Sequence, residues 1–221
     1  MTVQNASCNQ GANVFQYTYN GTHNDEWLFE ISSGTYDGFL GSKYARDNYN
    51  NHLNTYCNMT DLGGNCANFV SQCLAFSGKK YNGNWYVYKK NNNHLVPQNV
   101  TRLNDSWELS DPSPWISAKY FGQYWSSKVQ NDTFTPQQII DNNSATTAVY
   151  GKGDVVQILK RSSLQEFQGY HTMYVTDVED YNNKGTLKLK YHSSDTKDRT
   201  LSSICASYNS SDYKIRLYKI L

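Results

Sequence analysis

The chain has 221 residues, a formal net charge of +1 and a charged fraction of 18%. This length suits one sizeable domain, or one domain with a small appendage. Because no basic run or basic helix face stands out, the composition argues against a nucleic-acid-binding protein. No apolar stretch is long enough to span a membrane. The first residues, "MTVQNASCNQ", lack the regions of a signal peptide, so we expect either that the protein is not exported by that route or that this chain is a mature or trimmed form.

Two residue types stand out in the composition. The 19 tyrosines, with abundant asparagine, suit contact with carbohydrate or a cell surface, and composition bias is the alternative explanation. The five cysteines form no C-x-x-C pair, so we expect no structural zinc site. We also expect no other metal and no cofactor. An odd number leaves at least one thiol outside any disulfide. These cysteines are Cys8, Cys57, Cys66, Cys73 and Cys205.

The first forty residues differ from the rest of the chain. They alternate apolar and polar residues in short runs broken by Asn-Gly and Ser-Gly, which predicts two or three short strands. We therefore divide the chain into a β-rich appendage, residues 1–40, and a main domain, residues 41–221. Helical spacing of apolar residues then predicts an amphipathic helix over 43–57 and a second helix over 67–76.

The rest of the chain predicts an α+β fold. Residues 79–115 form a long aromatic and polar region, which is usually functional or mobile in a compact domain. Two short helices are expected after it, the second with Thr135 as its N-cap and Pro136 at its first position. Alternating β-rich segments follow at 153–160, 170–178, 186–194 and 213–220. Helices first and an antiparallel sheet second are typical of the α+β class.

Cys66 is the leading candidate for a nucleophile. It follows Gly63, Gly64 and Asn65 and begins a predicted helix, where the dipole and the first N–H groups stabilise a thiolate. Its own N–H would help to hold a developing oxyanion. The alternative is that Cys66 is simply a small buried residue. Cys73, on the same helix, is expected to belong to the core.

A nucleophilic cysteine needs a base, and His171, on a predicted strand, is the best candidate. A hairpin turning near residues 181–182 brings residue 171 roughly opposite residue 192, so His192 is expected beside His171. Asp195 lies just past that strand and would reach the same imidazole. Either His192 or Asp195 is therefore the third member of the site. Structural histidines, or a two-histidine metal site, are the alternatives.

The order of four segments, "NCANFVSQCL", "GKGDVVQI", "YHTMYV" and "YHSSD", resembles the putative amidase domain family. The resemblance covers residues 43–221 and implies a papain-like, CHAP-like cysteine amidase. It implies that Cys66 is the nucleophile and His171 the base, with His192 and Asp195 in the motif after the catalytic strand. Many members carry Asp before the cysteine, where this chain has Asn65, so the charge at that position is altered.

The appendage carries a second resemblance. The segment "NVFQYTYNGTHNDEWLFE" is similar to one repeat of a ricin-type lectin, with "NDEW" in place of the usual Gln-X-Trp. Such a fold needs three repeats, so a complete sugar-binding domain is not expected. In a full repeat, Trp27 would be a core residue more often than a sugar platform.

These observations predict a cysteine-dependent hydrolase that cleaves peptide or amide bonds of bacterial peptidoglycan. We expect Asn65, Trp85 and Tyr170 to contact substrate, with additional carbohydrate contact. We also expect a monomer that is secreted, associated with the cell wall or encoded by a phage. The rival interpretations are a cysteine peptidase or toxin that acts on proteins, and a carbohydrate-binding module without enzymatic activity.

Overall fold

The computed structural model describes residues 2–3, 14–15, 36–179, 185–192 and 196–220. The chain divides into two units, residues 1–33 and residues 34–221. In the first unit, strand β1 (Thr2–Val3) pairs antiparallel with β2 (Val14–Phe15). The rest of the lectin-like segment, including Trp27, lies outside the described residues.

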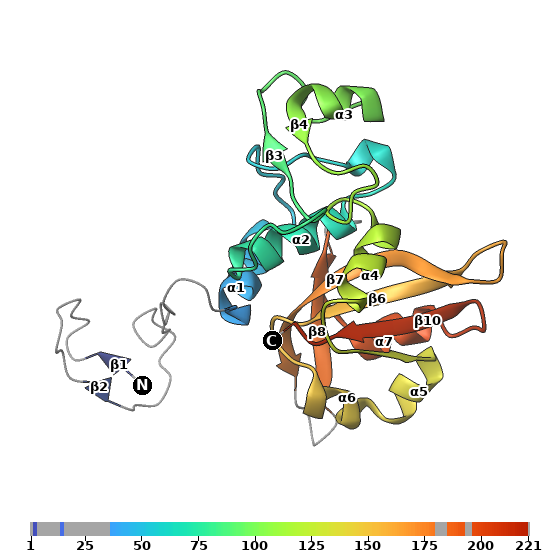
Figure 1. Ribbon diagram of the computed structural model, residues 1–221. Helices are drawn as coiled ribbons and strands as arrows, with labels where there is room; N and C mark the ends of the chain where they lie inside the picture. The colour runs from blue at the N-terminus through green and yellow to red at the C-terminus, as the bar shows by residue number, and fades with distance from the viewer. Residues whose placement is uncertain (1, 4–13, 16–35, 180–184, 193–195, 221) are drawn as a thin grey trace. The chain divides into compact units, whose positions relative to one another are not determined.

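A six-stranded antiparallel sheet organises the second unit, as the α+β prediction requires (Figure 1). The strand order is β5-β10-β6-β7-β8-β9, with every neighbouring pair antiparallel. The long strand β7 lies in the interior of the sheet, next to β6 and β8. The strands are β5 (Asn131–Phe134), β6 (Val155–Arg161), β7 (Phe167–Glu179), β8 (Thr186–Tyr191), β9 (Thr196–Thr200) and β10 (Tyr213–Tyr218).

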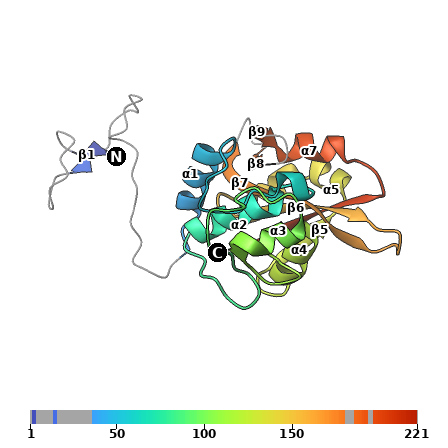
Figure 2. The ribbon, with the colours of Figure 1, turned by 90° about the horizontal axis from the view of Figure 1, so that it is seen from above.

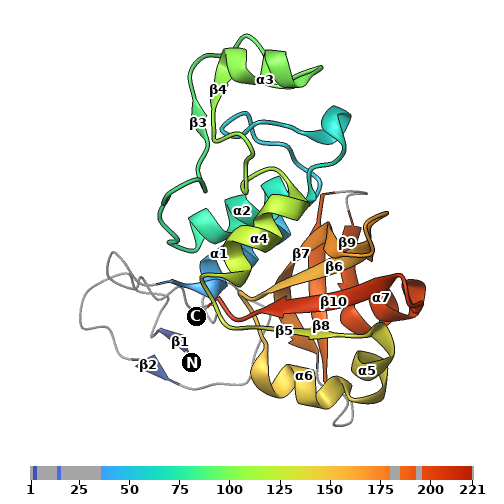
Figure 3. The same cartoon turned by 45° about the vertical axis from the view of Figure 1, so that its right-hand side comes forward.

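Helices cover both faces of this sheet and give it two apolar cores. On one face lie α1 (Gly38–Asn48), α2 (Cys66–Phe76) and α4 (Ala118–Ser126), all three of which contact β7 (Figure 2). On the other face lie α5 (Pro136–Asp141), α6 (Asn143–Val149) and α7 (Leu201–Ser207) (Figure 3). None of the helices in the described ranges is long and apolar enough to cross a membrane.

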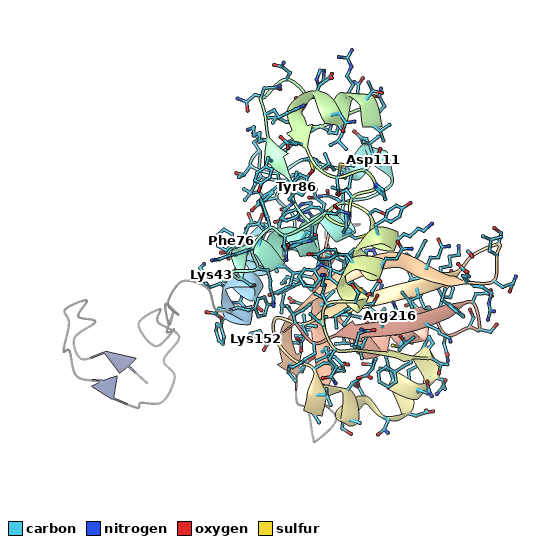
Figure 4. The ribbon with its side chains drawn as sticks, viewed as in Figure 1. Lys43, Phe76, Tyr86, Asp111, Lys152 and Arg216 are labelled. Atoms are coloured by element: carbon cyan, nitrogen blue, oxygen red, sulfur yellow. The ribbon has the colours of Figure 1, made fainter. Side chains whose placement is uncertain are left out.

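A small lobe lies on the far side of α2 from the sheet (Figure 1). It contains β3 (Tyr88–Lys89), α3 (Val100–Ser106) and β4 (Trp107–Glu108) and is built from the long aromatic region. Tyr86 and Asp111 stand where this lobe joins α2 (Figure 4). Trp85 and Trp115 of this region bond to side chains of α2, so the aromatic region forms a cap over α2, with its own short strand pair.

The helix boundaries follow local capping chemistry. Asp37 accepts a hydrogen bond from the Phe39 N–H and so starts α1 five residues before the predicted helix over 43–57. The helix ends at Asn48, and residues 49–57 form a loop, so the second half of that prediction is wrong. The prediction for α5 is confirmed, because Thr135 and Gln138 form a capping box with Pro136 in the first turn. The predicted appendage boundary at residue 40 falls inside α1.

A cluster of hydroxyl groups joins α1 and α2 to the sheet. The Tyr174 hydroxyl of β7 lies 2.9 Å from Ser77 Oγ and 3.0 Å from the Tyr36 hydroxyl. The Tyr36 hydroxyl also donates to the Gly153 carbonyl. A Cβ on Gly41 would lie 2.0 Å from Ser77 Oγ and 2.1 Å from the Tyr174 hydroxyl. Only glycine therefore lets α1 approach the sheet this closely.

We expect Gly41→Ala to lower the free energy of unfolding by about 1–3 kcal/mol, because the added methyl group overpacks this cluster. Lys43→Ala, on the exposed side of α1, is the matched control. It removes an exposed ion pair with Asp47 and should change stability by no more than about 0.5 kcal/mol. Urea unfolding monitored by circular dichroism measures both, and a Gly41→Ala protein as stable as wild type would contradict this packing.

Candidate functional site

Cys66 is the first residue of α2, and two glycines bring the chain to it. Gly63 and Gly64 have φ values of 100° and 115°, in the left-handed region, and a Cβ on either would meet nothing within 4 Å. Glycine is thus needed at both positions for backbone conformation and not for space. Cys66 itself is 8% exposed. It lies at the opposite end of α2 from Phe76, which Figure 4 shows beside α1.

The Asn65 side chain, just before Cys66, does not cap the helix. Its Oδ1 instead accepts hydrogen bonds from the Met59 N–H, at 3.0 Å, and from Asn68 Nδ2, at 2.7 Å. Asn68 Nδ2 also donates to the Cys57 carbonyl. The two amides therefore bind the loop that precedes α2 to the first turn of the helix. They also fix which atom of the Asn65 amide is oxygen, because both neighbours of that atom are donors.

The other buried polar residues of α2 hold the aromatic cap in place. Asn68 Oδ1 accepts from Trp115 Nε1 at 2.9 Å. Ser71 Oγ donates to the Trp115 carbonyl, at 3.0 Å, and accepts from Trp85 Nε1, at 3.1 Å. Gln72 accepts from the Tyr44 hydroxyl of α1 at 2.8 Å. The polar positions of "CANFVSQ" are thus partners for neighbouring elements, a role that sequence reasoning missed.

His192 lies at the start of α2. Its ring stacks on Phe69, with 3.9 Å between ring centroids, and its side chain is buried at 4% exposure. Its Nδ1 lies 3.0 Å from Asn65 Nδ2, and its Nε2 bonds to the Asn48 carbonyl at the end of α1. Since a carbonyl can only accept, Nε2 carries a proton. The imidazole is thus fixed by an acceptor on one nitrogen and a donor on the other.

A second histidine belongs to this group, and the sequence analysis gave it no role. His52 comes from the loop after α1, and its Nδ1 lies 3.2 Å from the same Asn65 Nδ2. Its ring centroid is 4.6 Å from that of His192. The sequence signal was weak, because His52 lies in a polar segment within residues expected to be helical. Only the loop at 49–57 turns it toward α2.

His171 faces the other side of the sheet. It pairs across β6 with Ile158, whose side chain lies in the core beneath α5 and α7. Its ring packs edge-on against Tyr191, with 4.5 Å between centroids. Burial, together with the positive charge of Arg199, lowers the pKa of His171 to about 4. The helices α1 and α2 pack on the opposite face, where Thr172 and Tyr174 point.

The register of β7 and β8 explains why the two histidines separate. Tyr174 pairs with Lys190, so the same register continued by two residues brings Thr172, and not His171, opposite residue 192. The expectation that placed His192 beside His171 is off by one residue. A shift of one residue sends a side chain to the other face of a sheet. His192 therefore reaches α2 while His171 does not share its surroundings.

The remaining predicted site residues lie in different surroundings. Trp85 is 1% exposed and packs against Trp115 and Trp125, which corrects the expectation that it contacts substrate. Trp115 and Trp125 are core residues. Tyr170 is 50% exposed at a bulge in β7, and its contact with substrate stays a prediction.

Asp195 lies outside the described residues, so its contribution to the site also stays a prediction. No group of three His, Cys, Asp or Glu side chains that could hold a metal ion occurs in the described ranges.

The other described cysteines are buried thiols with unfavourable ionisation. Burial raises the pKa of Cys57 and of Cys205 to about 12, and it raises that of Cys73 well above the ordinary value. Cys73 is fully buried in the core, as predicted. Cys66 differs from all three by its place at a helix N-terminus, directly after Asn65, whose amide contacts two histidines.

His171 should make the fold sensitive to acid. The unfolded chain takes up a proton on this histidine below pH 6.5, whereas the folded protein does so only near pH 4. Stability from this residue is therefore lost as the pH falls from 6.5 to 4. We expect His171→Gln to reduce the drop in the free energy of unfolding between neutral pH and pH 4 by on the order of 2 kcal/mol. Urea unfolding at neutral pH and near pH 4 measures this, and an unchanged loss would contradict a buried neutral His171. His94→Gln, in the small lobe, is the control.

Comparison with known proteins gives one match. No curated protein and no solved structure matches the chain. A family profile described as "Putative amidase domain" matches residues 35–218, which includes the whole sheet and all the helices of the second unit. Nothing in these comparisons supports a lectin repeat in the first forty residues. The family description indicates an amide hydrolase, and the chain belongs to the putative amidase domain family.

Proposed function

We propose that the protein is a cysteine-dependent amide hydrolase in which Cys66 is the nucleophile and His192 is the general base. One observation carries this proposal: a buried, oriented imidazole lies against Asn65, the residue bonded to Cys66 at the start of α2. A cysteine at a helix N-terminus with an oriented histidine next to it is the arrangement that a thiol nucleophile needs to hydrolyse an amide.

His192 suits the base role better than His171, which the sequence analysis favoured. The Asn48 carbonyl holds the proton on Nε2, so Nδ1 carries the lone pair and lies at the start of α2. The Asn48 carbonyl orients the ring, and Nδ1 would exchange its hydrogen bond from Asn65 for the Cys66 proton during the reaction. His171 packs on Tyr191, on the opposite face of the sheet, and its low pKa makes it a weak base.

The proposed reaction proceeds in two halves. The Cys66 sulfur attacks the amide carbonyl carbon while His192 accepts the thiol proton, and a tetrahedral oxyanion forms. The C–N bond then breaks, and the imidazolium gives its proton to the leaving amine. Water attacks the resulting thioester with His192 as the base, which releases the carboxylic acid and restores the thiol. The backbone N–H of Cys66, in the first turn of α2, supports the oxyanion.

We propose peptidoglycan peptides or cross-bridges as the substrate class, with secretion or attachment to the cell wall as the setting. The resemblance to papain-like wall amidases and the abundance of tyrosine support this choice. We further propose that Tyr170, exposed at the bulge of β7, and Asp195, near the end of β8, contribute to binding and orientation. The protein is proposed to act as a monomer. Hydrolysis of amide bonds in other proteins is the rival activity.

Cys66→Ala should abolish clearing of purified Gram-positive peptidoglycan, because no other described cysteine has its setting. Cys205→Ala, in the other core, is the control and should keep activity. Turbidity loss measures the rate, and mass spectrometry of the released fragments identifies the bond. Clearing by Cys66→Ala would overturn the thiol mechanism. If wild type clears no wall but cleaves casein, the peptidase is supported. If it does neither, the result supports a binding module in which Cys66 has no catalytic role.

Substitutions of His192 and His171 should have different effects on kcat. His192→Ala should lower kcat by about 10²–10⁴-fold, since it removes the proposed general base. His171→Gln should keep kcat within a few-fold of wild type at neutral pH, because this side chain faces the other core. The same assay applied to Asp195→Ala tests its orienting role. A large loss in His171→Gln with a small loss in His192→Ala would return the base role to His171.

A further inference from the structure

Asn65 contacts two histidines through a single nitrogen. Its Nδ2 lies 3.0 Å from Nδ1 of His192 and 3.2 Å from Nδ1 of His52. Because Oδ1 of the same amide is engaged by the Met59 N–H and by Asn68 Nδ2, the amide cannot rotate to exchange its donor and acceptor ends. Both of its N–H bonds are therefore directed at the two imidazoles.

We propose that Asn65 is a positioning residue that holds His192 and His52 as neutral imidazoles, each with a bare Nδ1 and a protonated Nε2. An N–H donor can pair only with an unprotonated ring nitrogen. For His192 the Asn48 carbonyl imposes the same tautomer from the opposite side of the ring. The two constraints agree, so the ring is held as a neutral base before substrate arrives. The tautomers follow from these contacts, and only their catalytic use depends on the proposed function.

The same donor opposes the protonated ring. When Nδ1 of His192 takes up a proton, the Asn65 N–H faces another N–H and the contact becomes repulsive. A carboxylate at position 65 would reverse this, because it accepts from Nδ1 and favours the imidazolium. Asn65 thus favours the neutral Cys66–His192 pair, whereas Asp at this position would favour a thiolate–imidazolium pair. His52 becomes a further residue of the site, since the same amide holds it next to His192.

Three described elements pack around His192. Phe69 from α2, the Asn48 carbonyl from α1 and His52 from the following loop pack against its ring. Among the described residues, the titratable groups on this side include His52, Cys66, Lys190 and Tyr49. Lys190 lies two residues earlier on the same face of β8, and its charge is paired with Asp198 at 2.9 Å. The Asn65 amide is the contact common to both histidines.

Nuclear magnetic resonance of the full chain labelled with ¹⁵N-histidine tests the proposal at neutral pH. The wild type should show Nε2–H and bare Nδ1 signals for both rings, assigned with His52→Gln and His192→Gln. In Asn65→Asp, Nδ1 of His192 should become protonated, which gives an imidazolium. His94, in the small lobe, is the internal control, and its ring signals should not change.

Each outcome bears on the proposal separately from catalysis. A wild-type His192 with its proton on Nδ1, or an imidazolium in the wild type, would overturn it even if Asn65→Asp failed to fold. Unchanged ring signals in a folded Asn65→Asp protein would also overturn it. Because the readout needs no turnover, the expected tautomers in a protein without amidase activity would leave the role of Asn65 standing and reject the proposed function.

Discussion

The arrangement around the start of α2 depends on two side-chain amides, Asn65 and Asn68. The loop before the helix is partly buried, and its N–H and C=O groups need partners there. An amide supplies a donor and an acceptor together, so Asn65 satisfies Met59 while Asn68 satisfies Cys57. A carboxylate has no donor, and an apolar side chain has neither group. The loop, the nucleophile candidate and both histidines therefore depend on amide chemistry at these positions.

The burial of α2 explains why so many of its polar residues are engaged. The helix lies between the sheet and the aromatic cap, and nine of its eleven residues are buried. A helix covered nearly all round has no solvent-facing side for its polar groups. Each polar side chain is therefore bonded to a neighbouring element, and each such bond also orders that element. Packing and site geometry thus share the same side chains, which makes them hard to vary independently.

Much of the fold was predictable from local patterns. The α5 capping box and strands β6, β7, β8 and β10 follow from turn chemistry and alternation, whereas β5 and β9 were not predicted. Cys66 was expected at a helix start. The site was harder, because its histidines depend on register: Thr172 pairs where His171 was expected. His52 was not predicted as a site residue, because it was expected to lie in a helix. The helical spacing of apolar residues continues past Asn48, but the helix itself ends there. The burial of Trp85 was not predicted, because no local sequence pattern distinguishes an aromatic residue in a buried cap from one that lines a cleft.

The hydroxyl cluster around Tyr174 has a consequence for where the domain begins. Tyr36 lies before the first helix, yet its hydroxyl bonds to Gly153 and contacts Tyr174 in the interior strand β7. A fragment that began at residue 41 would lose this tyrosine together with Asp37, the N-cap of α1. Buried oxygen atoms near β7 would then lose a partner, although every strand of the sheet was present. The five residues before Gly41 are thus part of the folding unit, and the minimal autonomous fragment must include them.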